Sequence, residues 1–181
     1  MTSVLKVDNI QNSSGTDAIS VDSGGRVDLS NTTMLQIYRL TSNVTSNDAT
    51  MQPWETPDDA TAINIGDAMT ESSGIFSFPR TGIYNIRGFG NFVGASGDTS
   101  VNFGIEVSTD SGSTYDAVAY LISGGSGEQT SGYTECNINV TDASTFRVKL
   151  KTGSFSSGSY VVGSSTFNRT AVIFEYKAPA Q

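Results

Sequence analysis

The side chains with the most chemical potential in this chain are carboxylates. They form two local groups in the sequence, which are Asp58 and Asp59 with Glu55 and Asp67, and Asp110 with Asp116. Oxygen ligands of this kind suit calcium or magnesium. Neither group has the alternating ligands, central glycine and closing glutamate of an EF-hand loop. We therefore predict solvated loop charges, and retain Asp58 and Asp59 as calcium candidates.

Two shortages in the composition limit other chemistry. The sequence has no histidine, so it lacks the commonest general base, the Ser-His-Asp and Cys-His arrangements and the usual zinc ligand. Its single cysteine, Cys136, can form neither an intrachain disulfide nor a cysteine cluster, and we expect it to pack as a small buried hydrophobe. We predict that the protein is not an enzyme and uses no cofactor.

The charge balance argues against two classes of partner. Ten basic and 18 acidic residues give a net charge of −8, which disfavours binding to nucleic acids and to anionic membranes. No apolar run approaches the roughly 18 residues that span a bilayer, and the first residues do not resemble a signal peptide. Nine Phe and seven Tyr in 181 residues are enough to build a core, so we expect a folded domain.

Period-two alternation of apolar and polar residues dominates the sequence. It is clearest over residues 101–108, 136–141 and 146–151, where every second side chain is apolar. Each segment predicts a strand with one buried face, and turns rich in Gly, Ser and Asp separate the segments. Helical periodicity is nearly missing, because Gly, Ser and Thr interrupt each candidate. The pattern predicts an all-β sandwich or barrel.

Two segments, residues 83–90 and 171–176, are apolar on both faces. A sandwich buries only one face of each sheet, so the outer face of these strands needs a second cover. That cover is either a loop of the same chain or another copy of the chain, and a closed oligomer avoids the filaments that open contacts produce. The predicted interface residues are Ile83, Arg87, Phe89, Ile173 and Glu175.

The first thirty residues differ from the rest. They contain short strand-and-turn units with two or three aliphatic side chains each, and no aromatic residue precedes Tyr38. Such units cannot offset an ordering cost of about 1–2 kcal/mol per residue by themselves. They are either a flexible tail or a segment ordered by assembly. We favour the second reading, with an extended attachment segment over residues 1–32 and a head domain over residues 33–181.

The stretch over residues 74–86 contains a Phe-x-Phe-Pro-x-x-Gly-x-Tyr pattern, formed by Phe76, Phe78, Pro79, Gly82 and Tyr84. This pattern resembles the globular heads of the tumour necrosis factor and complement-head superfamily, and the likeness extends over residues 33–178. It implies an antiparallel jelly-roll sandwich with the three aromatic rings in the core. It also implies a hairpin over residues 137–150 and a last strand after residues 165–167.

Residues 4–15 and 21–27 resemble the openings of fibre and appendage proteins from tailed bacterial viruses. Together with the jelly-roll likeness, this predicts a homotrimeric virion protein at the particle surface. Residues 1–32 would contact other virion proteins, and the head would adhere to a host glycan or protein. The main alternative is a decoration protein that clamps neighbouring capsid subunits, and a third is a secreted lectin or carbohydrate-processing enzyme.

Two aromatic residues are candidates for ligand contact. Trp54, between Pro53 and Pro57, either covers an open edge of the barrel or stacks on a sugar. Phe155 belongs to one of three Gly- and Ser-rich loops, at residues 94–98, 123–131 and 152–159. We expect an adhesive contact surface at the end of the head farthest from residue 30, because binding residues commonly sit on loops of a rigid β scaffold. The three loops are its candidates, and the sequence leaves open which of them reach that end.

A short basic row consists of Arg147, Lys149 and Lys151. It is either a solvated face or a set of charges near a symmetry axis. In the second case we expect it to pair with acidic groups such as Glu175, within one chain or between chains.

Overall fold

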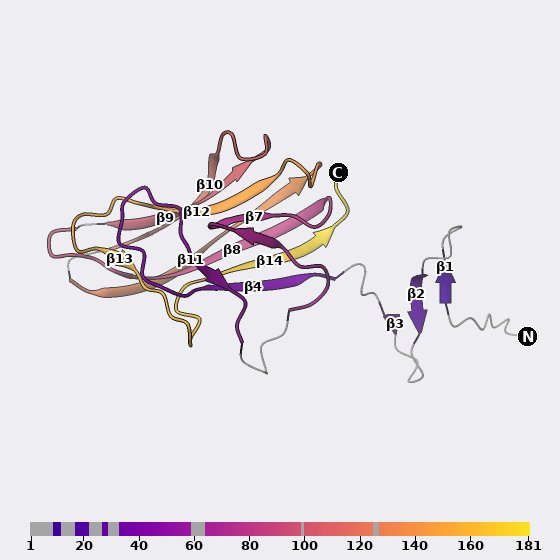
Figure 1. Ribbon diagram of the computed structural model, residues 1–181, viewed down its shortest axis with the longest axis horizontal. Coiled ribbons are helices and arrows are strands. Elements are labelled where there is room, and N and C mark those ends of the chain that lie inside the picture. The colour runs from indigo at the N-terminus through magenta and orange to yellow at the C-terminus, as the bar shows by residue number, and fades with distance from the viewer. Residues whose placement is uncertain are drawn as a thin grey trace, which may run out of the picture.

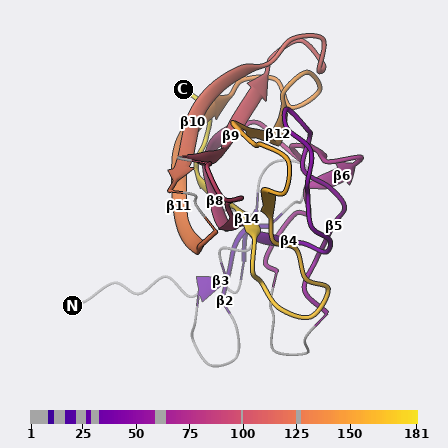
Figure 2. The same ribbon diagram turned by 90° about the vertical axis from the view of Figure 1, so that its left-hand side faces the viewer.

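The computed structural model describes residues 9–11, 17–21, 27–28, 33–58, 64–98, 100–124 and 127–181 (Figure 1). Throughout these residues, every regular element is a β-strand, as the alternation predicted. No helix in these segments is long and apolar enough to cross a membrane. From residue 33 on, the strands form two antiparallel sheets that face each other, which Figure 2 shows along the strand direction. The predicted all-β sandwich is therefore confirmed.

The first sheet, called here the six-stranded sheet, has the order β11-β8-β14-β4-β5, and β13 pairs with one end of β8. Its strands are β4 (Leu35–Leu40), β5 (Trp54–Glu55), β8 (Gly82–Val93), β11 (Gln129–Val140), β13 (Tyr160–Val161) and β14 (Ala171–Ala178). The long strand β8 is central, with β11 along one side and β14 along the other. Every strand pair in this sheet is antiparallel.

The second sheet, called here the five-stranded sheet, has the order β10-β9-β12-β7-β6. Its strands are β6 (Thr70–Ser72), β7 (Ile75–Ser77), β9 (Val101–Ser108), β10 (Asp116–Ser123) and β12 (Arg147–Gly153). The alternation in β9 behaves as predicted, because Val101, Phe103 and Ile105 are fully buried between the sheets. Strand β10 forms one edge, beside β9.

The predicted hairpin over residues 137–150 is wrong. Strand β11 pairs with β8 in the six-stranded sheet, whereas β12 lies between β9 and β7 in the five-stranded sheet. The residues between them carry the chain from one sheet to the other. The turn is held by Asp142, whose Oδ1 accepts hydrogen bonds from the backbone N of Ser144 at 2.9 Å and from its Oγ at 2.6 Å. The alternation of apolar and polar residues therefore predicted these two strands correctly, but it did not predict which strands they pair with.

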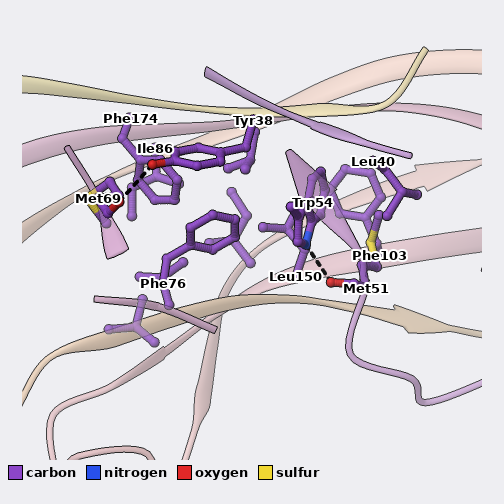
Figure 3. Packing of buried hydrophobic residues seen from close by; sticks show 14 of the residues in the cluster. Tyr38, Leu40, Met51, Trp54, Met69, Phe76, Ile86, Phe103, Leu150 and Phe174 are labelled. Atoms are coloured by element: carbon purple, nitrogen blue, oxygen red, sulfur yellow. Dashed lines mark hydrogen bonds between the residues drawn. The ribbon is translucent and has the colours of Figure 1, made fainter. Parts of the chain in front are cut away.

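Aromatic rings from both sheets fill the core (Figure 3). Phe76 lies at the centre, with ring centroids 5.1 Å from Tyr38, 5.9 Å from Trp54 and 5.0 Å from Phe174. The hydroxyl of Tyr38 donates a hydrogen bond to the carbonyl oxygen of Met69 at 2.8 Å, so burial leaves this polar group satisfied. The aromatic content that predicted a core is thus concentrated between the sheets.

The Phe-Pro-Gly-Tyr stretch adopts the structure that the family resemblance implied. Phe78 and Tyr84 are buried with ring centroids 4.8 Å apart, and the Tyr84 hydroxyl donates to the carbonyl oxygen of Arg80 at 2.8 Å. The turn between them ends at Gly82. A Cβ on Gly82 would lie 2.2 Å from the ring of Tyr176, so this close approach requires glycine.

Phe103 of the five-stranded sheet packs directly on the backbone of β8. A Cβ on Gly88 would lie 2.7 Å from the Phe103 ring, and a Cβ on Gly90 would lie 2.3 Å from it. The ring also stacks on Phe92, with centroids 5.6 Å apart. These two glycines therefore allow the sheets to approach closely at this point.

A separate small sheet precedes the head. Strands β1 (Asn9–Gln11), β2 (Asp17–Val21) and β3 (Val27–Asp28) pair antiparallel in that order. In the described part of the chain, this sheet shares no strand with the two sheets of the head. The short strand-and-turn units expected there are present. The boundary between residues 32 and 33 stays a prediction, since residues 29–32 lie outside the described residues.

Candidate functional site

The five predicted interface residues lie on the outer face of the six-stranded sheet. Alternation along β8 turns Tyr84 and Ile86 into the core and Ile83 and Phe89 outwards, where both remain only half-buried. Strand β14 places Ile173 on the same outer face, directly opposite Arg87 in the register, and Glu175 two residues further on. We call this surface the association face.

A groove of about 420 Å³ runs across the association face, lined by Arg87, Phe89, Tyr133, Glu135 and Ile173. Tyr133 is 64% exposed, and Arg87 Nε donates to Glu135 Oε2 at 3.1 Å. The sequence analysis missed Tyr133 and Glu135, which belong to β11. The signal was available, because inward-facing Cys136 and Ile138 in the same strand imply that residues 133 and 135 point outwards.

Further charged and polar groups on the association face are paired within the chain. Glu175 Oε1 lies 2.6 Å from Lys177 Nζ, and the side-chain amide of Asn85 donates to Asn137 Oδ1 at 3.1 Å. The predicted pairing of Glu175 with the basic row is therefore wrong within one chain. The neighbour of Glu175 is a lysine in its own strand, which the sequence analysis did not consider.

The basic row lies on the other sheet, on the outer face of β12. Lys149 Nζ is 3.2 Å from Glu106 Oε2 and 3.8 Å from the ring centre of Tyr115, and its side chain is largely buried. Lys151 Nζ is 3.2 Å from Asp48 Oδ1. Arg147 donates to the carbonyl oxygens of Phe146 and Ser144. Within one chain the row is consequently neither a free solvated face nor a partner for Glu175, and pairing between chains stays a prediction.

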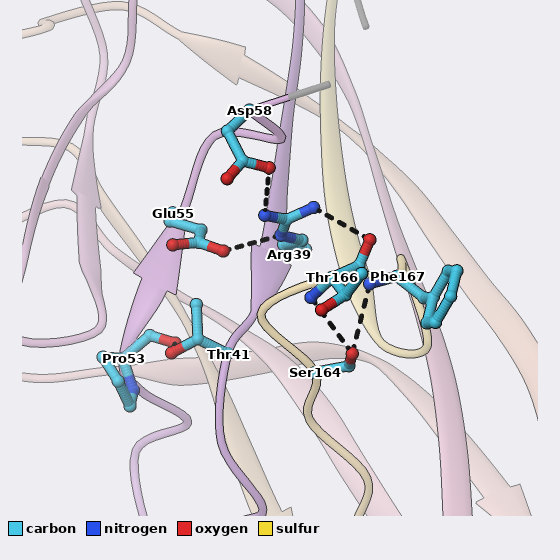
Figure 4. Close-up of polar contacts among 8 residues, drawn as sticks. All are labelled: Arg39, Thr41, Pro53, Glu55, Asp58, Ser164, Thr166 and Phe167. Atoms are coloured by element: carbon cyan, nitrogen blue, oxygen red, sulfur yellow. Dashed lines mark hydrogen bonds and ion pairs between the residues drawn. The ribbon is translucent and has the colours of Figure 1, made fainter.

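The candidate calcium ligand Asp58 forms an ion pair with Arg39 (Figure 4). Arg39 is 2% exposed, and it donates from Nε to Glu55 Oε1 at 2.7 Å and from Nη2 to Asp58 Oδ1 at 2.6 Å. Its Nη1 also donates to the carbonyl oxygen of Thr166 at 3.3 Å. The carboxylates therefore neutralise a buried cation, and Oδ1 of Asp58 is committed to Arg39. The calcium site itself stays a prediction. Asp59 lies outside the described residues.

The second acidic group also serves the fold. Asp110 accepts hydrogen bonds from the backbone N and Oγ1 of Thr114 at 2.9 and 2.7 Å, and from Ser108 Oγ at 2.7 Å. These bonds to Thr114 and Ser108 stabilise the ionised carboxylate and lower the pKa of Asp110 to about 2. Across the described segments, no group of three or more Asp, Glu, His or Cys side chains could share a metal ion.

The two aromatic residues proposed for ligand contact both pack against the core, Trp54 fully and Phe155 in part. Trp54 is 7% exposed, packs against Phe76, and donates from Nε1 to the carbonyl oxygen of Met51 (Figure 3). Phe155 is half-buried against the core, and its backbone N donates to Asn47 Oδ1 at 3.0 Å. The prediction of ligand contact is therefore wrong for Trp54, a core residue, and Phe155 has a packing role.

The sequence left open which of the three candidate loops reach the far end, and described residues of each lie at the end of the head opposite the start of β4. In the register, Leu35 pairs with Glu175 and Ile83 pairs with Ala178 at the near end. At the far end, shown on the left in Figure 1, Val93 pairs with Gln129. The described residues next to these far-end positions are residues 94–98, 124, 127–128 and 154–159. We call this end the distal end.

Hydrogen bonds tie the three loops together. Asp98 Oδ2 accepts from the backbone N of Ser156 at 3.1 Å and from Ser159 Oγ, and these bonds lower the pKa of Asp98. The Oγ of Ser159 also accepts from the backbone N of Ala95, while the backbone N of Gly127 donates to the carbonyl oxygen of Gly94. The distal end is thus one connected surface rather than three independent loops.

No protein-family model and no curated protein matches this sequence. Among solved structures, the Eiger TNF from S. frugiperda matches with a TM-score of 0.64 at 10% identity, covering 82% of this chain and 95% of that one. Murine APRIL at pH 8.5 matches with a TM-score of 0.59 at 11% identity, covering 80% and 99% of the two chains. At pH 5.0 it matches with a TM-score of 0.60 at 12% identity and the same coverage. The head therefore has the TNF-like jelly-roll fold.

Proposed function

We propose that this protein is a structural, non-catalytic head that assembles into a homotrimer through the association face. The observation that carries this proposal is the outward apolar surface formed by Phe89, Ile173 and Tyr133 around a groove of about 420 Å³. Contiguous exposed apolar surface of this kind commonly marks a protein contact. Burying one such side chain contributes roughly 1.5–3 kcal/mol, so a few of them per subunit favour association.

The position of the groove favours a ring over a two-fold dimer. It extends from the edge strand β11, which carries Tyr133, to the centre of the sheet at Phe89 and Ile173. When the edge of one subunit packs on the face of the next, the contact is heterologous, and such contacts form a ring where the rotation between neighbouring subunits closes. The resemblance to the tumour necrosis factor and complement-head superfamily suggests that the ring has three subunits. In this ring the first residues of the three β4 strands lie at the same end of the trimer.

Sedimentation of the full chain tests the assembly. We expect a trimer at micromolar concentration, and Tyr133→Asp should dissociate it without unfolding, because residue 133 is exposed in the single chain. Phe89→Asp and Ile173→Asp should dissociate or misfold it, since an unpaired charge in an apolar contact costs several kcal/mol.

The matched control for Tyr133→Asp is Tyr120→Asp. Tyr120 is 56% exposed and lies on β10 of the five-stranded sheet, and it does not line the groove of the association face. This variant should remain a trimer. A monomeric wild-type protein, or a Tyr133→Asp variant that stays trimeric, would overturn the proposed assembly.

We further propose that the trimer is a virion appendage at the particle surface, attached through residues 1–32. The resemblance of residues 4–15 and 21–27 to viral fibre openings supports this assignment, as does a small sheet that precedes the head. A variant without residues 1–32 should still form the head but should fail to enter virus particles. Normal incorporation of that variant would contradict the attachment role.

The alternative, a capsid decoration protein, makes a different prediction for images of the particle. An appendage projects from one socket with its distal loops outwards, whereas a decoration protein lies flat across several capsid subunits. Shortening the loops at residues 94–98, 124–128 or 154–159 one at a time should lower adsorption to host cells if the head is adhesive. Unchanged adsorption by intact trimers would favour the decoration role.

A further inference from the structure

A second groove lies on the outer face of the five-stranded sheet, close to the distal end. Its volume is about 590 Å³, within the range of roughly 300–1,000 Å³ that is usual for ligand pockets. The floor is formed where Gly153 of β12 pairs with Asn102 of β9. A Cβ on Gly153 would lie 2.6 Å from Asn102 Oδ1, so glycine at this position leaves room for the Asn102 side chain to lie over the floor of the groove.

One wall of the groove is a preformed aromatic platform. Tyr120 of β10 lies opposite Gly104 of β9, and a Cβ on Gly104 would lie 2.9 Å from Cε1 and 3.2 Å from Cδ1 of the ring. The ring therefore lies against the glycine backbone, which fixes it, yet it remains 56% exposed. Ile122, which is 65% exposed, continues the apolar wall. A platform held in place before binding loses little conformational entropy when a ligand stacks on it.

The opposite wall and the rim are polar. The loop before β5 supplies Asn47 and Asp48, with Asn47 Nδ2 donating to Asp48 Oδ2 at 3.2 Å and Asp48 Oδ1 lying 3.2 Å from Lys151 Nζ. On the floor, Asn102 Nδ2 donates to Ser154 Oγ at 2.9 Å. Amide, carboxylate, hydroxyl and ammonium groups thus surround the platform, offering both donors and acceptors.

We propose that this groove binds a neutral saccharide. A sugar ring has an apolar face of C–H groups, which suits the Tyr120 platform, and a rim of hydroxyls that each donate and accept, which suits Asn47, Asn102 and the Asp48–Lys151 pair. The charges disfavour an anionic ligand, because Lys151 is already paired and the chain carries a net charge of −8. Only two of the lining side chains, Tyr120 and Ile122, are large and apolar, which is too few for a lipid chain.

This inference deepens the proposed function, since it gives an adhesive head its ligand class. The groove and the association face lie on the outer faces of different sheets. Each variant can therefore be tested for both properties. Tyr120 variants should lose saccharide binding and keep the trimer, whereas Tyr133 variants should lose the trimer and keep saccharide binding.

Saturation-transfer NMR on the full chain tests the proposal, with glucose, galactose and N-acetylglucosamine as separate probes at millimolar concentration. We expect saturation transfer to at least one sugar, and Tyr120→Ala should lower that affinity about tenfold or more, which corresponds to about 1.4 kcal/mol. Tyr120→Phe keeps the platform and should bind within about twofold of wild type. Tyr133→Ala, at a similarly exposed tyrosine, is the matched control and should bind normally.

Asp48→Ala provides a second variant on the opposite wall, in an exposed loop, and should also weaken binding. The absence of saturation transfer to all three sugars would overturn the proposal. Binding that is unchanged in both Tyr120→Ala and Asp48→Ala would overturn it too. A wild-type monomer that still binds sugar would disprove the trimer while leaving the groove assignment intact.

Discussion

Replacing Gly90 by alanine should destabilise the head, although the change adds a single methyl group. The new Cβ would lie 2.3 Å from Phe103 Cε1, against an optimal carbon–carbon separation of about 3.5–4.0 Å. Phe103 is fully buried and stacks on Phe92, so its ring cannot move by the 1 Å or more, roughly, that the methyl group needs. Overpacking of this kind costs about 1–3 kcal/mol.

An opposing effect reduces this cost. Alanine restricts the unfolded chain more than glycine does, which stabilises a protein by about 0.4–1 kcal/mol where the folded site is compatible. The expected net loss for Gly90→Ala is therefore about 1–2 kcal/mol in the free energy of unfolding. Gly124→Ala is the matched control, because nothing lies within 4 Å of the Cβ position there. That substitution should be neutral or slightly stabilising.

Urea unfolding at one fixed chain concentration measures these differences, since association would otherwise change the apparent stability. A double-mutant cycle then identifies the cause. With Phe103→Leu as background, the cost of Gly90→Ala should fall by about 1 kcal/mol, because the atom that the methyl group meets is gone. Our reasoning is refuted if Gly90→Ala is as neutral as Gly124→Ala, or if Phe103→Leu leaves its cost unchanged.

Two further predictions concern ionisation. Hydrogen bonds from Thr114 and Ser108 lower the pKa of Asp110 in the folded protein from 3.8 to about 2. The stabilisation that these bonds provide is therefore fully present at pH values above the pKa of the unfolded chain. It is lost as the pH falls towards about 2. The stability gap between wild type and Asp110→Asn should therefore close between about pH 5 and pH 2 in urea titrations, and a pH-independent gap would contradict this. Burial, with a smaller effect from Glu135, raises the pKa of Cys136 from 9.0 to about 11. Because the thiolate is the reactive form, iodoacetamide at about pH 8 should modify the folded protein about a hundredfold more slowly than the unfolded chain. Mass spectrometry that shows equal rates would disprove this prediction.

Local periodicity was sufficient to predict much of the fold. The strands β9, β11 and β12 were visible because each alternates cleanly, and the burial of Phe76 and Tyr84 followed from a short pattern with a recognisable turn. These features depend on residues close together in the sequence. The sheet to which a strand belongs depends on distant residues, which explains the error over residues 137–150.

The functional residues were harder to predict, for physical reasons. The polar neighbours of Trp54 left two readings open, a structural cap on the barrel edge and a ligand contact. Its ring in fact packs in the core, and its indole N–H donates to the carbonyl oxygen of Met51. The Tyr120 platform was missed because it depends on Gly104 in the adjacent strand and on a loop some 70 residues earlier, roughly, in chain order. Correct predictions for Trp54 and Tyr120 would have required knowledge of which side chains meet across neighbouring strands.

The first strand of the head and residue 181 lie at the same end of the sandwich. Leu35, at the start of β4, pairs with Glu175, and Gln181 is hydrogen-bonded through its backbone N and O to Asn139 at that same end of β11. Any module joined after residue 181 would therefore start beside the N-terminal segment. Strand β8 has 12 residues, or about 40 Å at roughly 3.3 Å per residue. Two heads stacked end to end in one polypeptide would need a linker that retraces this whole length, whereas two heads side by side would need only a short one.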